Sequence, residues 1–298
     1  MPSKTEDTAV GTPTLGEEIN AATRPMHTRL NKLVVSRLRL ALPPFVDDPK
    51  NYVTGLLHIA PIYQVFEREW NAILEGTPEA AKTEPRVRAL LSDIYVHGLA
   101  RVDAIHEDVS ILLGRDNALV RSRVESISHA AVLGDYKEHI HKTIQERPHV
   151  LVAYAWVLYM ALFSGGRFIR ASLERTDRNT GFRAPAPDED KHNPWDRMPG
   201  AFNAFCAEAE LRKRARIPPP MNFFSFDTPE EGEDLKKMFK EALVEATSPP
   251  NSKLTEEERA DVVREAQNIF EYMIRIVGEL DEICGTEYEE QAAAATAK

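Results

Sequence analysis

Apolar residues recur at helical spacing along most of the chain, and no long segment alternates apolar and polar residues as a half-buried strand does. Residues 49–75 show the pattern clearly, with apolar side chains three or four positions apart: Leu56, Leu57, Ile59, Ile62, Tyr63 and Phe66. Thr14 with Glu17, and Thr255 with Glu258, match the capping box that opens a helix. The sequence therefore predicts an all-α fold, a single domain of about eight helices.

Expected helices cover residues 15–40, 49–75, 85–113, 116–133, 135–145, 147–175, 200–214, 230–246 and 255–284. Pro25 falls inside the first helix and should kink it or divide it in two. Residues 1–13 are polar and aperiodic and are expected to be disordered, whereas the helical domain spans 14–285. A Pro- and Asp-rich loop insertion is expected at 178–200, and a flexible polar tail at 286–298.

Charge and cysteine content exclude several classes of protein. The net charge of −10 lacks the basic excess of a nucleic-acid-binding surface. Cys206 and Cys284 form no Cys-x-x-Cys pair, which argues against a cysteine zinc site or a disulfide framework and favours a reducing compartment. No transmembrane run and no signal peptide are recognisable. We expect a soluble, cytoplasmic protein with no nucleic-acid partner and no membrane anchor.

Gly165 and Gly166 stand side by side inside an otherwise apolar helical segment. Each glycine costs a helix about 1 kcal/mol relative to alanine, so a pair of them needs a physical reason. Adjacent glycines allow either the close packing of another helix or the close approach of a ligand to the backbone. From the residues alone, both interpretations stay open.

Three separated segments together resemble the heme oxygenase family. Residues 19–33 (INAATRPMHTRLNKL) place a histidine early in the first helix, and residues 149–169 contain a Ser-Gly-Gly. Residues 221–283 contain a Phe-Phe-x-Phe turn, then a lysine-bearing helix and a closing helix. The shorter matches IYQVFEREW and AIHEDVSILLG lie between them in the family's order. The resemblance covers about residues 15–284, so it concerns the whole fold.

The resemblance implies a fold in which heme lies between the first helix and a distal helix that bends at glycines. It also implies an activity: heme is opened to biliverdin, ferrous iron and CO, with O2 and electrons from a reductase. Heme b would then be both cofactor and substrate, and the protein would be a monomer. Under this interpretation, Gly165 and Gly166 let the backbone lie against the porphyrin face.

His27 matches the family's proximal ligand of the heme iron. An imidazole nitrogen is a good iron ligand and leaves the opposite face of the heme open to dioxygen. Leu30, Val34 and Leu38 share the same helical face and would turn His27 inward. The alternative for His27 is a structural histidine at the edge of that apolar stripe.

The two heme propionates require cationic partners. Arg24, Lys236 and Lys240 match the family's positions for them, and the two lysines share one helical face. Lys237 lies on another face and is expected to point into solvent. The alternative for Lys236 and Lys240 is that they too are solvated surface lysines. The resemblance implies three further residues at the heme: Tyr63, Phe270 and Met273.

The chain departs from the family at Leu162. The family pattern Gly-Asp-x-x-Gly-Gly is Ala-Leu-Phe-Ser-Gly-Gly at residues 161–166, so the aspartate that orders water beside bound dioxygen is absent. Val157 and Leu158 also replace residues that are typically Thr and Arg, and we expect a dry distal face. A heme-binding relative without ring-opening activity (a heme carrier, a sensor or a weak peroxidase) is therefore the main alternative.

Ser164 and Tyr63 are the polar residues nearest to the distal position and could substitute for the aspartate. A third hypothesis, a carboxylate-bridged di-metal bundle, rests on three carboxylate-x-x-His pairs: Asp103/His106, Glu138/His141 and Glu146/His149. Their segments are mostly polar, so solvated histidines are the ordinary explanation. The basic run LRKRAR at 211–216 could dock an acidic reductase or could simply be a solvated face.

Overall fold

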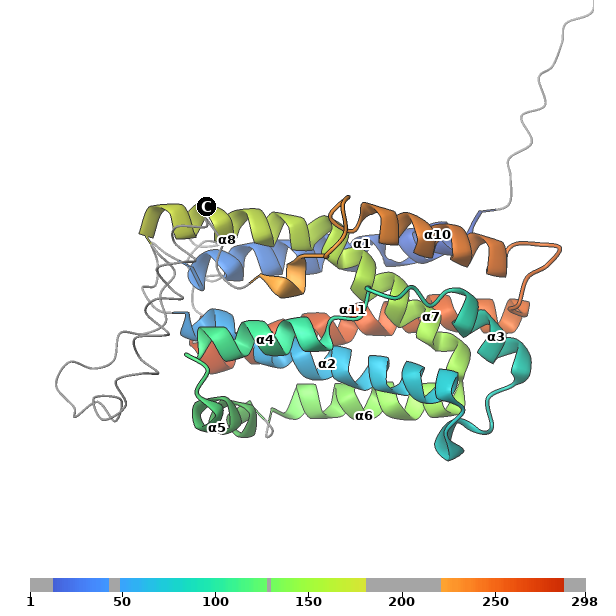
Figure 1. The fold of residues 1–298 in the computed structure, drawn as a ribbon, viewed down its shortest axis with the longest axis horizontal. Coiled ribbons are helices and arrows are strands. Elements are labelled where there is room, and N and C mark those ends of the chain that lie inside the picture. Colours follow the sequence, from blue (N-terminus) through green and yellow to red (C-terminus); the bar gives the residue numbers. More distant parts are fainter. Residues whose placement is uncertain (1–12, 43–48, 128–129, 181–220, 287–298) are drawn as a thin grey trace, which may run out of the picture.

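The structure is a computed structural model that describes residues 13–42, 49–127, 130–180 and 221–286. Over these residues it consists of helices and turns, with no strand, which confirms the all-α fold (Figure 1). The helices are α1 (Leu15–Leu40), α2 (Lys50–Glu75), α3 (Pro85–Asp93), α4 (Val102–Leu112), α5 (Asn117–Ile127), α6 (Ala131–Glu146), α7 (Leu151–Tyr154), α8 (Arg167–Thr180), α10 (Glu233–Thr247) and α11 (Glu256–Cys284).

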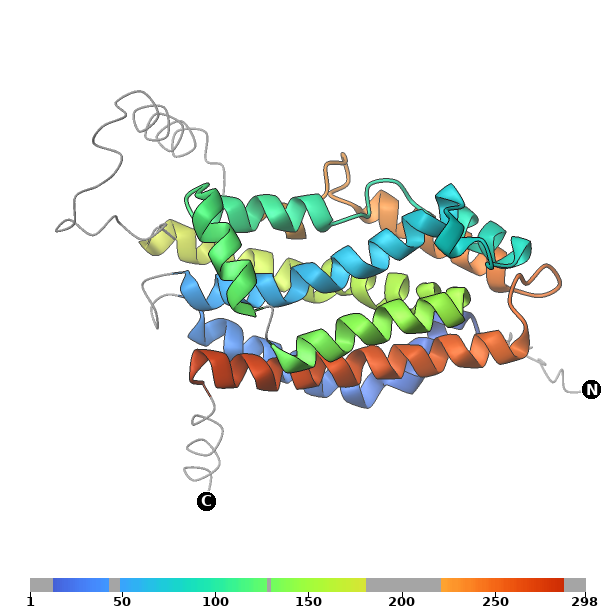
Figure 2. The same ribbon diagram turned by 90° about the horizontal axis from the view of Figure 1, so that it is seen from below.

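The long helices form a bundle in which α1 and α11 lie side by side, as Figure 2 shows. On the other side of the bundle α2 packs against α4 and α6. The chain from α7 to α8 changes direction, and this bend brings it across the bundle near α1 and α10 (Figure 1). The core is continuous and aromatic-rich, with fully buried side chains such as Trp70, Tyr136, Tyr154, Phe66 and Phe239.

Both predicted capping boxes are present. The Thr14 hydroxyl accepts a hydrogen bond from the Glu17 backbone N–H at 3.3 Å, and the Glu17 carboxylate accepts from the Thr14 N–H at 2.8 Å. Thr255 and Glu258 repeat this arrangement at the start of α11. The expected division at Pro25 is wrong, because α1 continues through it, supported along its length by α11.

The helix expected over 85–113 is two helices, α3 and α4, with a turn over 94–101 between them. Gly98 adopts φ +100° within this turn, a conformation that favours glycine and that a right-handed helix does not contain. The Arg101 guanidinium stabilises the turn by donating to the carbonyls of Gly98, Leu99 and Ala100. The sequence predicts one helix over 116–133 and the next over 135–145. In the structure α5 ends at Ile127 and α6 begins at Ala131.

Several sequence-based expectations lie wholly or largely outside the described residues: the terminal segments, the helix over 200–214, Cys206 and the basic run 211–216. The expected loop insertion at 178–200 is wrong at its start, because α8 extends to Thr180, and its remainder lies outside the described residues. The stretch Pro148–Glu174 is long and apolar enough to cross a membrane by composition, contrary to the expectation of no such run. Most of it is buried inside the bundle, as the core helix of a soluble fold would be.

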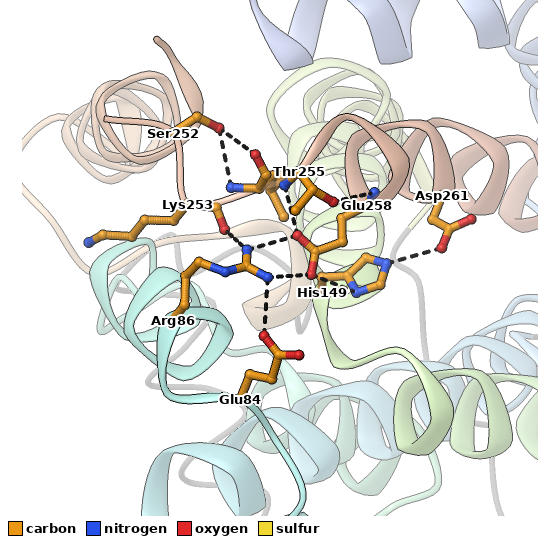
Figure 3. Close-up of polar contacts among 9 residues, drawn as sticks. Glu84, Arg86, His149, Ser252, Lys253, Thr255, Glu258 and Asp261 are labelled. Atoms are coloured by element: carbon orange, nitrogen blue, oxygen red, sulfur yellow. Dashed lines mark hydrogen bonds and ion pairs between the residues drawn. The ribbon is translucent and has the colours of Figure 1, made fainter. Parts of the chain in front are cut away.

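A polar cluster fixes the start of the segment 149–169, called the distal segment below, to α3 and α11 (Figure 3). Arg86 donates two hydrogen bonds of 2.8 Å to the Glu258 carboxylate and one of 2.5 Å to the carbonyl of Lys253. His149, just before α7, lies 3.3 Å from Asp261 and 3.9 Å from Glu258. The hydrogen bonds from Arg86 lower the pKa of Glu258 to about 2, against the opposing effect of burial.

This cluster predicts a loss of stability in acid. The pKa of Glu258 falls from 4.5 to about 2 on folding, so its contribution is complete above pH 4.5 and is lost as the pH falls through about 2. Glu258→Gln should lower the free energy of unfolding at neutral pH and flatten its dependence on pH between 4.5 and 2. Urea denaturation across that range measures the effect. Glu84→Gln is the control, because the Glu84 side chain is 70% exposed and should change little.

Candidate functional site

A cavity of about 1020 Å³ lies between α1, α2, the segment linking α7 to α8, and α11. Its walls are mainly aliphatic and aromatic, with Leu30 and Val34 from α1, Leu56 and Ile62 from α2, and Ile276 and Val277 from α11. Most of the site residues expected from the sequence line this one cavity: Arg24, His27, Tyr63, Leu162, Ser164, Gly165, Gly166, Phe270 and Met273. Residues distant in sequence therefore meet around one large apolar space.

His27 projects from α1 on the same face as Leu30, Val34 and Leu38, all of which line the cavity. Its side chain is exposed, and Phe270 meets the imidazole ring edge-on with 5.8 Å between ring centroids. None of the described residues forms a hydrogen bond with the imidazole. An exposed imidazole on an apolar wall is a suitable donor for a metal within a ligand that fills the cavity.

The two glycines of the distal segment differ in their surroundings. A Cβ added to Gly165 would meet no atom within 4 Å, so the backbone there faces open space. A Cβ on Gly166 would lie 3.2 Å from Phe224 Cδ1 and 3.5 Å from Leu162 Cβ. Gly165 thus fits the close approach of a ligand, and Gly166 fits close packing within the protein. The surroundings of each glycine are thus compatible with a different interpretation of the pair.

Two π-helical turns, Ala155–Tyr159 and Leu162–Gly166, form the bend between α7 and α8. A π-turn inserts a residue into the helical hydrogen-bond ladder and occurs frequently at functional sites. The buried Tyr63 hydroxyl donates a 2.9 Å hydrogen bond to the Leu158 carbonyl in the first turn. The sequence analysis missed both π-turns. The adjacent glycines, which lie in the second turn, were the one sequence signal of an irregularity in this helix.

The distal wall is apolar, as expected. Leu162 is 4% exposed and lines the cavity beside Val157 and Met160. Ser164 donates its hydroxyl proton back to the helix, at 3.3 Å from the Met160 carbonyl, and Tyr63 donates to Leu158. The two polar candidates therefore direct their protons to backbone carbonyls, so each hydroxyl oxygen can take part in a further hydrogen bond only as an acceptor.

Of the three expected propionate partners, Arg24 lines the cavity, whereas Lys236 and Lys240 do not. Lys236 forms hydrogen bonds of 2.9 and 3.1 Å with Glu233. The Lys240 ammonium lies 5.7 Å from the centroid of the Trp156 ring, and Trp156 itself lines the cavity. Lys237 is exposed, as its position on the helix predicts.

Trp156 is a residue that sequence reasoning missed. Its indole lies so close to α1 that a Cβ on Gly16 would be 2.3 Å from ring atom Cη2. The indole N–H donates a 3.1 Å hydrogen bond to Asn20, also on α1. Gly16 thus admits the ring between α1 and the distal segment, and Trp156 with Asn20 lines the cavity there.

The opposite end of the cavity carries an ion pair. Arg37 on α1 donates to Asp281 on α11 through two nitrogens, at 3.0 Å from Nε and 2.7 Å from Nη2. Thr286 adds a 2.6 Å hydrogen bond to the same carboxylate. These hydrogen bonds, led by that from Arg37, outweigh burial and lower the pKa of Asp281. The pair ties the ends of α1 and α11 together.

Two buried carboxylates lie behind the distal wall. Glu67 accepts hydrogen bonds from the backbone N–H of Arg101 at 2.8 Å and from the Tyr159 hydroxyl at 3.2 Å. Burial raises the pKa of Glu67 to about 7. Asp108 accepts from the backbone N–H groups of Asn222 and Phe223, both at 2.9 Å, and so fixes the Phe-Phe-x-Phe turn. Burial raises the pKa of Asp108 to about 6.

The carboxylate-x-x-His pairs do not converge on one centre. His141 lies 3.0 Å from Glu69 of α2, and His149 lies 3.3 Å from Asp261 of α11. Over the residues that the structure describes, no group of three or more His, Cys, Asp or Glu side chains could hold a metal ion. The geometry gives the di-metal hypothesis no support.

Substituting the two adjacent glycines should affect different properties, ligand binding at Gly165 and stability at Gly166. Gly165→Ala should leave the fold intact, since its methyl group meets open space, but should weaken binding of a flat ligand such as hemin roughly tenfold, about 1.4 kcal/mol. Gly166→Ala should affect stability more than binding, because its methyl group presses on Phe224. Thermal melts and hemin titrations on both variants measure the contrast. Equal loss of affinity in both would contradict it.

Comparisons with known proteins agree with this geometry. The sequence profile of the heme oxygenase family matches residues 13–279. The heme-binding protein HMX1 of Saccharomyces cerevisiae is 24% identical over 275 residues, covering 90% of this chain and 76% of HMX1.

Solved structures show the same fold. Heme oxygenase-2 from Synechocystis sp. PCC 6803, in complex with heme and NO, has a TM-score of 0.63 at 15% identity, covering 94% of this chain and 90% of its own. Heme oxygenase 2 from Chlamydomonas reinhardtii, without heme, has a TM-score of 0.61 at 19% identity. The match covers 89% of this chain and 97% of the Chlamydomonas chain.

Proposed function

The chain belongs to the heme oxygenase family, and on that premise we propose that it binds heme b in the cavity with His27 as the axial ligand of the iron. Family and fold support heme binding and a role of the heme oxygenase kind. The observation that carries the proposal is the pairing of an exposed imidazole on one wall with a bare backbone at Gly165 on another wall of the same cavity.

The chemistry of the cavity fits heme. Its aliphatic and aromatic walls match a flat apolar macrocycle, and its volume of about 1020 Å³ is ample for a ligand of that size. Arg24 offers a cation to a propionate at the wall that carries His27. Phe270 and Met273 supply further apolar contact from α11.

The proposed reaction is oxidative opening of the bound heme to biliverdin, ferrous iron and CO. Heme supplies the site at which dioxygen is activated, and a reductase supplies the electrons. In this proposal His27 holds the ligand from one side, Gly165 admits its distal face to close contact, and Leu162 with Val157 excludes bulk water. The hydroxyl oxygens of Ser164 and Tyr63 are the acceptors left to hold a water in the cavity.

A heme-binding protein without ring-opening activity is the second candidate. The observation that favours it is Leu162, which is 4% exposed and fills the wall where the family carries a carboxylate. An apolar wall orders no water by itself, so the oxygenase reaction loses the groups that support its proton transfers. A carrier, a sensor or a weak peroxidase would need the same heme site.

A single-turnover assay distinguishes the two candidates. Protein loaded with hemin is mixed with ascorbate or a generic reductase system under air, and the Soret band and the red absorbance of biliverdin are followed together. A falling Soret band with rising biliverdin supports the oxygenase. A Soret band that persists, or that bleaches without biliverdin, supports the heme-binding relative. No Soret band on adding hemin would overturn heme binding itself.

A further inference from the structure

A row of oxidisable aromatic rings leads from the cavity to the protein surface. Tyr63 lines the cavity, and its ring centroid lies 6.3 Å from that of Tyr159. Tyr159 lies 6.5 Å from Trp70, and Trp70 lies 5.5 Å from Tyr95. Tyr63, Tyr159 and Trp70 are at most 3% exposed, whereas Tyr95 is half-exposed. The row thus begins at the cavity, crosses the dry core and ends at solvent.

Tyrosine and tryptophan are, together with cysteine, the side chains most easily oxidised by one electron. Neighbouring rings at these centroid separations are in or near van der Waals contact, so each electron transfer crosses a short gap. Phe66 packs against both Tyr63 and Tyr159 but is not oxidised under the same conditions. The row therefore offers a defined sequence of redox steps rather than a diffuse aromatic core.

The phenolic proton decides which tyrosine in the buried row can be oxidised. Tyr159 donates its hydroxyl hydrogen bond to the Glu67 carboxylate at 3.2 Å, and a carboxylate can take up the proton. Tyr63 donates to the Leu158 carbonyl, which cannot act as a base in this way. Trp70 donates to the Leu91 carbonyl at 3.1 Å and keeps its indole proton, because an indole can be oxidised to a radical cation without a base. The pKa of Glu67, raised by burial to about 7, leaves the carboxylate substantially ionised near neutral pH.

We propose that Tyr159, Trp70 and Tyr95 carry oxidising equivalents from the heme cavity to the surface, an inference that rests on the proposed heme binding. The oxidant is hydrogen peroxide reacting at bound heme. Tyr159 loses one electron to the cavity across the Tyr63 ring, which is not itself oxidised, and the phenolic proton of Tyr159 moves to Glu67.

The remaining steps restore the buried residues. Trp70 returns an electron to Tyr159, and Glu67 returns the proton. Tyr95 then reduces Trp70 and releases its own phenolic proton to solvent. Each peroxide molecule takes up two electrons and two protons and becomes two water molecules. Two such transfers complete one turnover, and a one-electron reductant such as ascorbate reduces the Tyr95 radical after each transfer. Oxidation is thereby moved from the ligand cavity to an exposed phenol, where an external reductant can reach it.

The experiment uses the full chain loaded with hemin. The Soret band first verifies heme binding. One equivalent of hydrogen peroxide is then added, the sample is frozen rapidly for electron paramagnetic resonance, and a parallel sample is treated with a spin trap and mapped by mass spectrometry. The wild type should give an organic radical and a trapped adduct at Tyr95. Tyr159→Phe and Trp70→Phe should reduce the Tyr95 adduct to the level seen without peroxide, with the Soret band unchanged.

Glu67→Gln should have the same effect as Tyr159→Phe, because the base is lost while Tyr159 remains. Tyr272→Phe is the matched control, since Tyr272 stacks on Tyr136 outside the row and should not alter the adduct. An undiminished Tyr95 adduct in Tyr159→Phe and Trp70→Phe would overturn the inference while leaving heme binding intact. A radical lost instead in Tyr154→Phe, whose hydroxyl donates to Glu265 at 2.5 Å, would also overturn it. Absence of the Soret band would overturn the proposed function itself.

Discussion

His27→Ala should abolish turnover of heme and lower hemin affinity while leaving the fold unchanged. Loss of a group that merely supports a metal ligand typically costs 10–100-fold in affinity, so loss of the ligand itself should cost at least about tenfold. The His27 side chain is exposed and forms no hydrogen bond with the described residues, so its removal should not destabilise α1. Hemin titration followed at the Soret band measures the effect, with thermal melts to verify folding.

Two controls sharpen the test of His27. Exogenous imidazole should restore part of the Soret spectrum in His27→Ala, because it can occupy the space left by the side chain. His97→Ala removes another exposed histidine, which does not line the cavity, and should bind hemin like the wild type. An unchanged Soret spectrum in His27→Ala would show that another residue ligates the iron.

Leu162→Asp should raise the yield of biliverdin per heme consumed. The substitution places a carboxylate on the cavity wall, where it can accept hydrogen bonds from water beside the bound ligand. Leu162 is 4% exposed, so the new group should destabilise the heme-free protein by roughly 1–3 kcal/mol, the cost of a buried polar group without a partner. The single-turnover assay measures the yield, and urea denaturation measures the stability.

Leu162→Asn is the matched control, because it has nearly the same shape as Asp but no charge and no basic oxygen pair. A gain in Asp that is absent in Asn would assign the effect to the carboxylate. If the wild type has low activity and neither variant changes the yield, the missing carboxylate is not the cause of that low activity.

The sequence was informative where local chemistry decides structure. The capping boxes at Thr14 and Thr255 were predictable because their hydrogen bonds lie within four residues. The positions of His27 and Arg24 on the cavity wall followed from helical spacing together with the family resemblance. The all-α fold followed from the period of the apolar residues.

Other features depend on contacts between distant segments. The π-turns at Ala155–Tyr159 and Leu162–Gly166 differ from α-helix by one inserted residue, which leaves no mark in apolar periodicity. Lys236 and Lys240 were correctly predicted to share a helical face. The direction of that face is set by the packing of α10 on α1 and α3, and neither lysine lines the cavity. The difference between Gly165 and Gly166 likewise depends on Phe224, nearly sixty positions away.

The indole of Trp156, inserted against Gly16, acts as a spacer between the two walls of the cavity. Because the ring occupies the place that a side chain at Gly16 would take, α1 cannot approach the distal segment more closely at this edge. The hydrogen bond to Asn20 holds the ring in that position. The gap is therefore set before any ligand enters, and a flat ligand can insert without separating the helices, which lowers the reorganisation cost of binding.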